Sequence, residues 1–142
     1  YLLTIFLKMI DKSHHIYFTR THFMTWEYIQ STGELKHNGQ PFRQGYSGHG
    51  PGINNPAMES VNSEGPIPKG HYRITGSHDT VTPVTIILEP ILGTNTFGRD
   101  QFRIHGGSRS GGRTASNGCI IIDGVHNRQL ILNSGDTILV VR

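Results

Sequence analysis

The chain has 142 residues, of which 35% are hydrophobic and 16% are charged, so its length and composition suit one domain with a modest core. All 18 glycines and all 7 prolines lie between Gly33 and Gly135. These residues interrupt helices too often for an all-α fold, which is therefore excluded. The formal charge is +3, but the basic residues are neither gathered on a helix nor interleaved with aromatic residues, so nucleic-acid binding is not expected.

The first ten residues are apolar, but a membrane span needs about 20. They also lack the basic region and the small-residue cleavage site of a secretory signal. Residues 1–23 are interpreted either as a leader or added segment or as an ordinary β-strand. A single domain is expected over residues 24–142, with no membrane span.

Short strands separated by turns are predicted along the rest of the chain. A hairpin is expected from strands at 26–30 and 34–37, supported by the Asn38-Gly39 turn signal. Residues 43–70 are rich in Gly and Pro and predict a long loop of the kind that covers a site. Further strands are predicted at 71–75, 84–89, 101–105, 119–122 and 137–141.

One short helix is predicted near residues 125–132, with Asp123 as its N-cap. Many short strands and one small helix are typical of a mostly-β sandwich or barrel. The sequence therefore predicts a mostly-β fold with one short helix.

His105 and Cys119 end and begin two predicted strands, and thirteen residues with five Gly and three Ser separate them. This loop has no large apolar side chain, but it can fold back and bring the imidazole beside the thiol. A neighbouring imidazolium, with Arg109 and Arg113 adding positive potential, would raise the small thiolate fraction of Cys119 at neutral pH. The alternative is that Cys119, the single cysteine, is a small buried hydrophobe.

The turn Ser116-Asn117-Gly118 can direct backbone N–H groups at one point, as an oxyanion hole requires. Two further groups of residues are candidates for substrate binding, and ordinary surface positions are the alternative for each. Tyr46 and His49 could line the cleft, and Arg109 and Arg113 could hold a peptide carboxylate. The nine histidines show no metal-ligand spacing, so neither a metal nor another cofactor is expected.

These motifs resemble a known family. His105-Gly106, the Gly/Ser-rich loop and Ser116-Asn117-Gly118-Cys119 resemble the catalytic motif of the L,D-transpeptidases, the YkuD-like enzymes of bacterial cell-wall synthesis. Residues 67–74 (IPKGHYRI) are similar to the strand that precedes the site in that family. Residues 46–56 resemble the branch that type VI secretion delivers as an antibacterial toxin.

Two positions depart from the family pattern. Asn117 stands where many members have a second His, and Ile121 stands where a common variant carries an Arg that holds a substrate carboxylate. A carboxylate must be held here by another group, if it is held at all. No carboxylate side chain completes a triad, and in this family a backbone carbonyl typically orients the His.

The resemblance implies a YkuD-like β fold and a cysteine acyltransferase that acts on the tetrapeptide stems of peptidoglycan. Cys119 would be the nucleophile and His105 the general base, for L,D-carboxypeptidase or L,D-transpeptidase chemistry that includes D-amino-acid exchange. The resemblance also implies synthesis in a bacterial cytoplasm, export without a signal peptide, and action in the periplasm of a target cell. An immunity protein and a component of the secretion machine are the partners expected besides the stem peptides.

Two other functions stay open at this point. A non-catalytic wall-binding module could use the same groove. A sortase-like transpeptidase is suggested by Arg128, nine residues after Cys119, although the Thr-Leu-x-Thr-Cys sequence of sortases is absent.

Overall fold

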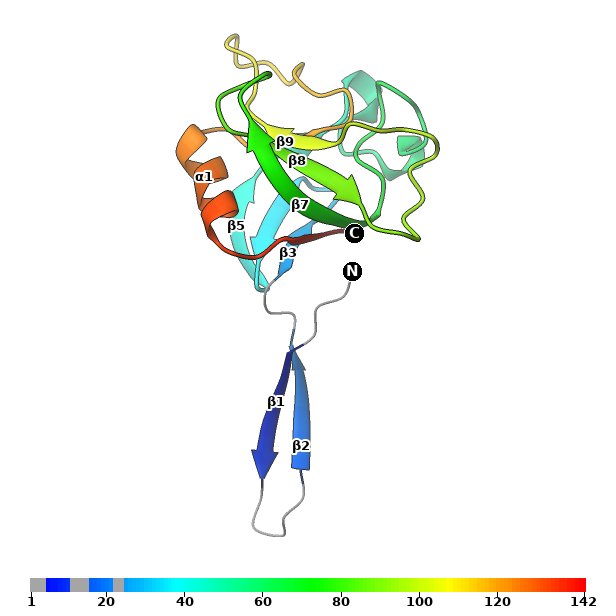
Figure 1. The fold of residues 1–142 in the computed structure, drawn as a ribbon. Coiled ribbons are helices and arrows are strands. Elements are labelled where there is room, and N and C mark those ends of the chain that lie inside the picture. Colours follow the sequence, from blue (N-terminus) through cyan, green and yellow to red (C-terminus); the bar gives the residue numbers. More distant parts are fainter. Residues whose placement is uncertain (1–4, 11–15, 22–24) are drawn as a thin grey trace.

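The computed structural model describes residues 5–10, 16–21 and 25–142 (Figure 1). Strands β1 (Ile5–Ile10) and β2 (Ile16–Thr21) pair antiparallel with each other and form a two-stranded sheet separate from the main one. The predicted domain boundary at residues 23 and 24 lies outside the described residues and stays a prediction.

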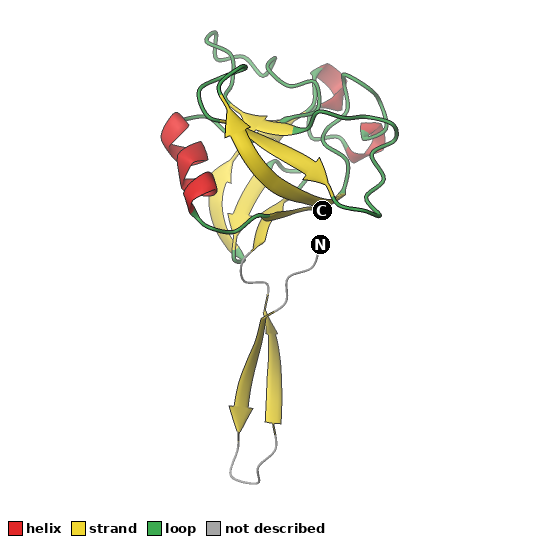
Figure 2. Ribbon diagram, in the orientation of Figure 1, coloured by secondary structure: helices red, strands yellow, loops and turns green. Residues whose placement is uncertain are grey.

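The main sheet has nine strands in the order β5-β4-β3-β11-β7-β8-β9-β10-β6. Their bounds are β3 (Thr25–Tyr28), β4 (Glu34–His37), β5 (Gln40–Gln44), β6 (Tyr46–Ser47), β7 (Gly70–His78), β8 (Thr85–Pro90), β9 (Arg103–His105), β10 (Ile120–Ile121) and β11 (Ile138–Val141). The strands curve around a common interior (Figure 2). The sheet is barrel-like and nearly closed, which confirms the mostly-β prediction.

Gly45 explains how the sheet nearly closes. The two edge strands β5 and β6 are joined by this residue alone, so the chain passes directly from one edge of the sheet to the other. Its N–H donates to the carbonyl of Gly33 at 2.8 Å. A Cβ on Gly45 would collide with the Ile121 carbonyl, so only glycine allows this close approach.

The predicted hairpin of residues 26–30 and 34–37 is confirmed, but the Asn38-Gly39 turn does not close it, because that turn joins β4 to the unpredicted strand β5. β3 pairs antiparallel with β4, and β4 pairs antiparallel with β5 across the Asn38-Gly39 turn. Both turn residues have positive φ, 52° and 80°, as a type I′ hairpin turn requires. Neither β5 nor β6 was predicted, and both include residues of the Gly/Pro-rich segment 43–70, which was expected to be a loop. The same segment contains the short 3-10 helices η1 (Gly50–Gly52) and η2 (Pro56–Met58).

Helix α1 (Val125–Asn133) lies at one side of the barrel (Figure 2). The prediction that Asp123 caps it is wrong, because Gly124 is the N-cap residue and, among the described residues, no side chain caps the helix. Asp123 is used elsewhere: its Oδ1 accepts the N–H of Gly107 at 2.8 Å. Asp123 thus restrains the loop that follows His105 instead of the helix.

Arg128 attaches the helix to the barrel. Its side chain is buried, and its guanidinium donates to the carbonyls of Pro83, Val84 and Ile122 at 2.6–2.8 Å. Since these three carbonyls use both terminal nitrogens and Nε, Arg128 is not available for the role that a sortase-like reaction would give it.

The barrel interior holds one hydrophobic core. Its largest members are Trp26, Tyr28, Tyr72 and Phe102, and branched side chains from most strands fill the space between them. The Tyr72 and Phe102 rings meet edge to face with centroids 5.7 Å apart. Within the described residues, no helix has the length and apolar character needed to cross a membrane.

Candidate active site

Cys119 and His105 line the same cavity, which has a volume of about 440 Å³. His105 is the last residue of β9, and Cys119 immediately precedes β10. The two strands pair in parallel, with Ile104 beside Ile120 and His105 beside Ile121. The glycine-rich loop therefore folds back as the spacing predicted, and it runs above the barrel (Figure 1, yellow to orange).

A backbone carbonyl orients the imidazole of His105. Nδ1 lies 2.8 Å from the carbonyl oxygen of Gly106, and the side chain is buried. A carbonyl only accepts, so this hydrogen bond requires a proton on Nδ1 and leaves the lone pair on Nε2. In this tautomer Nε2 can accept a proton from a nucleophile.

Burial keeps both groups neutral. Burial lowers the pKa of His105, and the charges of Arg128 and Arg103 lower it further against the opposing effect of the Gly106 carbonyl. Burial also raises the pKa of Cys119, although the backbone N–H of Arg103 and the charges of Arg103 and Arg99 act in the opposite direction. The resting site is therefore a neutral thiol and a neutral imidazole at neutral pH.

This result corrects the expectation of a stabilised thiolate beside an imidazolium. The cations that favour the thiolate are Arg99 and Arg103, not Arg109 and Arg113, and desolvation outweighs them. A nucleophile in this setting needs a base that removes the thiol proton during attack.

The turn before the cysteine is fixed by two buried serines. The Ser116 hydroxyl donates to the Cys119 carbonyl at 2.6 Å and accepts the N–H groups of Gly48 at 2.9 Å and Gly118 at 3.1 Å. A hydroxyl has one donor and two acceptor positions, so all three are filled. The Ser47 hydroxyl donates to the Gly118 carbonyl at 3.2 Å. The Gly118 amide is thus used within the turn.

Only glycine suits position 118, because of its backbone conformation and because of a side chain that lies close to it. Its φ is 132°, and a Cβ there would collide with Nη2 of Arg99. The Arg99 guanidinium is buried and donates to the carbonyls of Gly65 at 2.9 Å and Pro66 at 2.8 Å, and also to that of Glu59. It thereby ties residues 59–66 to the floor of the cavity.

The thiol has its own partner in this state. Sγ of Cys119 donates to the Gln101 carbonyl at 3.7 Å, and the two catalytic candidates, both within the described residues, are not hydrogen-bonded to each other. Gln101 has a left-handed φ of 60°, which is uncommon for a residue with a side chain. Catalytic hydrogen bonds are often long or absent before substrate binds, so this geometry is compatible with a thiol–imidazole pair.

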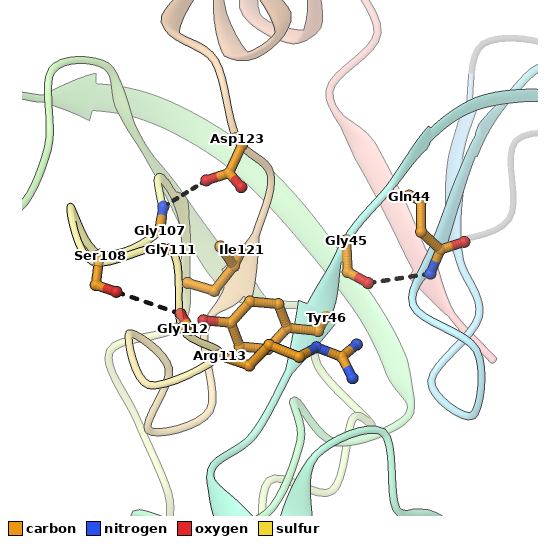
Figure 3. Close-up of a pocket in the computed structure, with 10 residues that line it drawn as sticks. All are labelled: Gln44, Gly45, Tyr46, Gly107, Ser108, Gly111, Gly112, Arg113, Ile121 and Asp123. Carbon is orange, nitrogen blue, oxygen red and sulfur yellow. Dashed lines mark hydrogen bonds between the residues drawn. The ribbon is translucent and has the colours of Figure 1, made fainter.

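The four predicted substrate-binding residues do not line this cavity. Tyr46 and Arg113 line a second pocket of about 230 Å³, where the Arg113 guanidinium lies 5.1 Å from the centre of the Tyr46 ring (Figure 3). Arg109 and His49 line neither this pocket nor the cavity of Cys119. The 43–70 segment does reach the cavity of Cys119, but through Asn62 and Ser63.

Sequence reasoning missed several residues of the cavity. The remaining lining residues include Arg99, Asp100, Gln101 and Arg103. The sequence could have indicated Arg103 as a residue of the site, because it precedes His105 by two positions in a predicted strand and such residues lie on the same face. Among the residues that the structure describes, no group of three or more His, Cys, Asp or Glu side chains is placed to hold a metal ion.

The fold and site define a mostly-β, barrel-like domain with a thiol, an imidazole and a glycine turn in one cavity. The Tlde1 domain profile matches residues 42–138, which include this whole site. The chain therefore belongs to the Tlde1 domain family, which by its name comprises type VI secretion L,D-transpeptidase effectors. Neither the curated proteins nor the solved structures provide a significant match.

Proposed function

We propose that this protein is a cysteine acyltransferase that acts on the tetrapeptide stems of peptidoglycan in the periplasm of a target cell. The observation that carries the proposal is the placement of Cys119 and His105 at the ends of adjacent strands in one cavity, with the imidazole oriented by the Gly106 carbonyl. Membership of the Tlde1 domain family supports both the transpeptidase-like chemistry and delivery by type VI secretion.

The proposed reaction begins with a neutral pair. Nε2 of His105 takes the thiol proton while Sγ of Cys119 attacks the carbonyl carbon that follows the L-centre of meso-diaminopimelate. The thiol leaves the Gln101 carbonyl in this step. The tetrahedral oxyanion forms beside the 116–119 turn, where the Cys119 amide is the proposed donor because the Gly118 amide already donates to Ser116.

The second half of the cycle resolves the thioester. The C–N bond breaks, and the imidazolium returns its proton to the amine of the departing D-Ala. The acyl group then passes to an acceptor whose proton His105 accepts. Water as acceptor gives L,D-carboxypeptidase activity, a D-amino acid gives exchange, and a second stem gives a cross-link.

The first test uses purified muropeptides and mass spectrometry of the products. Wild-type protein is expected to release D-Ala from disaccharide tetrapeptides or to exchange it for an added D-amino acid. Cys119→Ala is expected to lower the rate by about 10³-fold or more while thermal unfolding stays unchanged. Turnover near wild type in a folded Cys119→Ala variant would contradict the nucleophile assignment. Binding without turnover by the wild type would favour a wall-binding module.

The second test concerns the compartment. Expression with an added periplasmic signal is expected to damage the wall and slow growth, because stem peptides lie in the periplasm. Cytoplasmic expression of the same chain and periplasmic expression of Cys119→Ala are the matched controls, and both are expected to be harmless. Equal toxicity from the cytoplasm would point to a different target.

A further inference from the structure

Two arginines line the cavity of Cys119, and they differ in how their guanidinium groups are used. Arg99 is buried, with an exposed fraction of 6%, and donates to four backbone carbonyls. The side chain of Arg103 is only partly buried. Within the described part of the chain, no hydrogen bond or ion pair engages its guanidinium. Arg103 is thus the cation of this cavity that can bind a ligand without breaking a structural contact.

Arg103 lies close to both reactive groups. The parallel register that sets Ile104 beside Ile120 brings the preceding residue of β9, Arg103, next to Cys119. Arg103 also shares a face of β9 with His105, because the two residues are two positions apart. The electrostatic effect agrees with this placement, since the charge of Arg103 lowers the pKa of both Cys119 and His105.

The chemistry of the donor stem suits such a cation. The residue that leaves is the last of the stem, so a free carboxylate lies about one residue, or ~3.8 Å, beyond the attacked bond. A guanidinium binds a carboxylate through two parallel hydrogen bonds, which gives both energy and orientation. Ile121 is apolar and buried, and Arg109 and Arg113 do not line this cavity.

We propose that Arg103 binds the terminal carboxylate of the donor stem and so restricts the reaction to the release of a single C-terminal residue. This inference rests on the proposed acyltransferase function and adds its substrate selectivity. A stem with an amidated or extended C-terminus would place a neutral group opposite Arg103 and would lose this interaction.

The test compares a free tetrapeptide stem with the same stem carrying a C-terminal amide. Wild-type protein is expected to prefer the acid by about 10- to 100-fold in kcat/KM, as a charge-assisted interaction implies. Arg103→Gln is expected to remove this preference, and Arg103→Lys to retain part of it. Arg73→Gln is the matched control, because Arg73 is exposed on β7 and does not line the cavity of Cys119; it should keep the wild-type ratio.

The ratio of the two substrates separates binding from electrostatic activation of the thiol. An equal loss on acid and amide in Arg103→Gln would overturn the proposal, because it would show an effect on Cys119 or His105 alone. Equal use of both substrates by the wild type would overturn it as well, whereas a wild type that converts neither would overturn the proposed function itself. Affinity for the acid and the amide, measured in Cys119→Ala with and without Arg103→Gln, must show the same loss of preference independently of turnover.

Discussion

Two cavities share the glycine-rich loop between His105 and Cys119, and they are built in different ways. The cavity of Cys119 is lined mainly by strand ends and by the 99–103 segment, and buried hydrogen bonds from Ser116, Ser47 and Arg99 support its floor. The second pocket is lined largely by residues 107–113 with Tyr46 and Asp123 (Figure 3), and the exposed Arg113 lies over the Tyr46 ring.

The difference shows where precise geometry is available on this fold. Groups at strand ends inherit the register of the sheet, and groups on the loop are held by fewer and more exposed contacts. Chemistry that needs fixed donors therefore suits the first cavity better than the second. Four measurements test this contrast.

Removal of the imidazole should give the largest effect of the four. His105→Ala is expected to lower kcat by about 10²- to 10⁴-fold, because the thiol then has no base to remove its proton. Steady-state rates on a tetrapeptide stem measure the loss, and circular dichroism checks that the fold is retained. A rate within a few-fold of wild type would exclude His105 as the base.

The two cavities should respond differently to one added methyl group. The Cβ of Gly118→Ala would collide with Nη2 of Arg99, and the positive φ of this position disfavours any residue with a side chain. The substitution should therefore displace the cysteine turn and lower kcat/KM about 10²-fold. Gly112→Ala is the matched variant in the second pocket, where the nearest atom lies 3.8 Å away, and it should change kcat/KM by less than about twofold. Similar losses in both variants would remove the distinction between the cavities.

The pH dependence should report the neutral resting pair. Burial lowers the pKa of His105 from its ordinary value of 6.5, so the base form should persist to a pH below 6.5. kcat/KM should fall about tenfold per pH unit only below that lowered pKa. The raised pKa of the thiol should appear as slow alkylation of Cys119, the single cysteine, until alkaline pH. An acid limb centred above pH 7 would contradict this assignment.

The smallest effect is expected in the second pocket. Arg113→Gln removes an exposed charge that contacts the Tyr46 ring, and exposed charges contribute little. Turnover of a tetrapeptide stem should stay within about twofold of wild type. A loss as large as that of Arg103→Gln would assign a substrate carboxylate to Arg113 and would give the second pocket a direct part in binding.

Local signals in the sequence were sufficient for much of the fold. The Asn38-Gly39 signal located a hairpin turn because both positions have positive φ, although the turn joins β4 to β5 and not to β3. Apolar β-branched runs located β8 and β11. Strand β6 was missed because two residues carry no periodicity. The Asp123 cap was a wrong prediction because a nearby backbone amide, that of Gly107, competes for the same carboxylate.

Some features of the site could also be predicted from the sequence, and others could not. The sequence was sufficient to predict that His105 and Cys119 come together, because a glycine-rich loop without large apolar side chains can fold back between two strand ends, and the glycine turn before the cysteine is a local feature. The neutrality of the buried pair and the support of the turn by Arg99 became evident in the tertiary structure alone. The tertiary structure also brought Arg103, and not Arg109 or Arg113, beside the thiol. Desolvation and sheet register depend on residues far apart in the chain, and no local pattern encodes them.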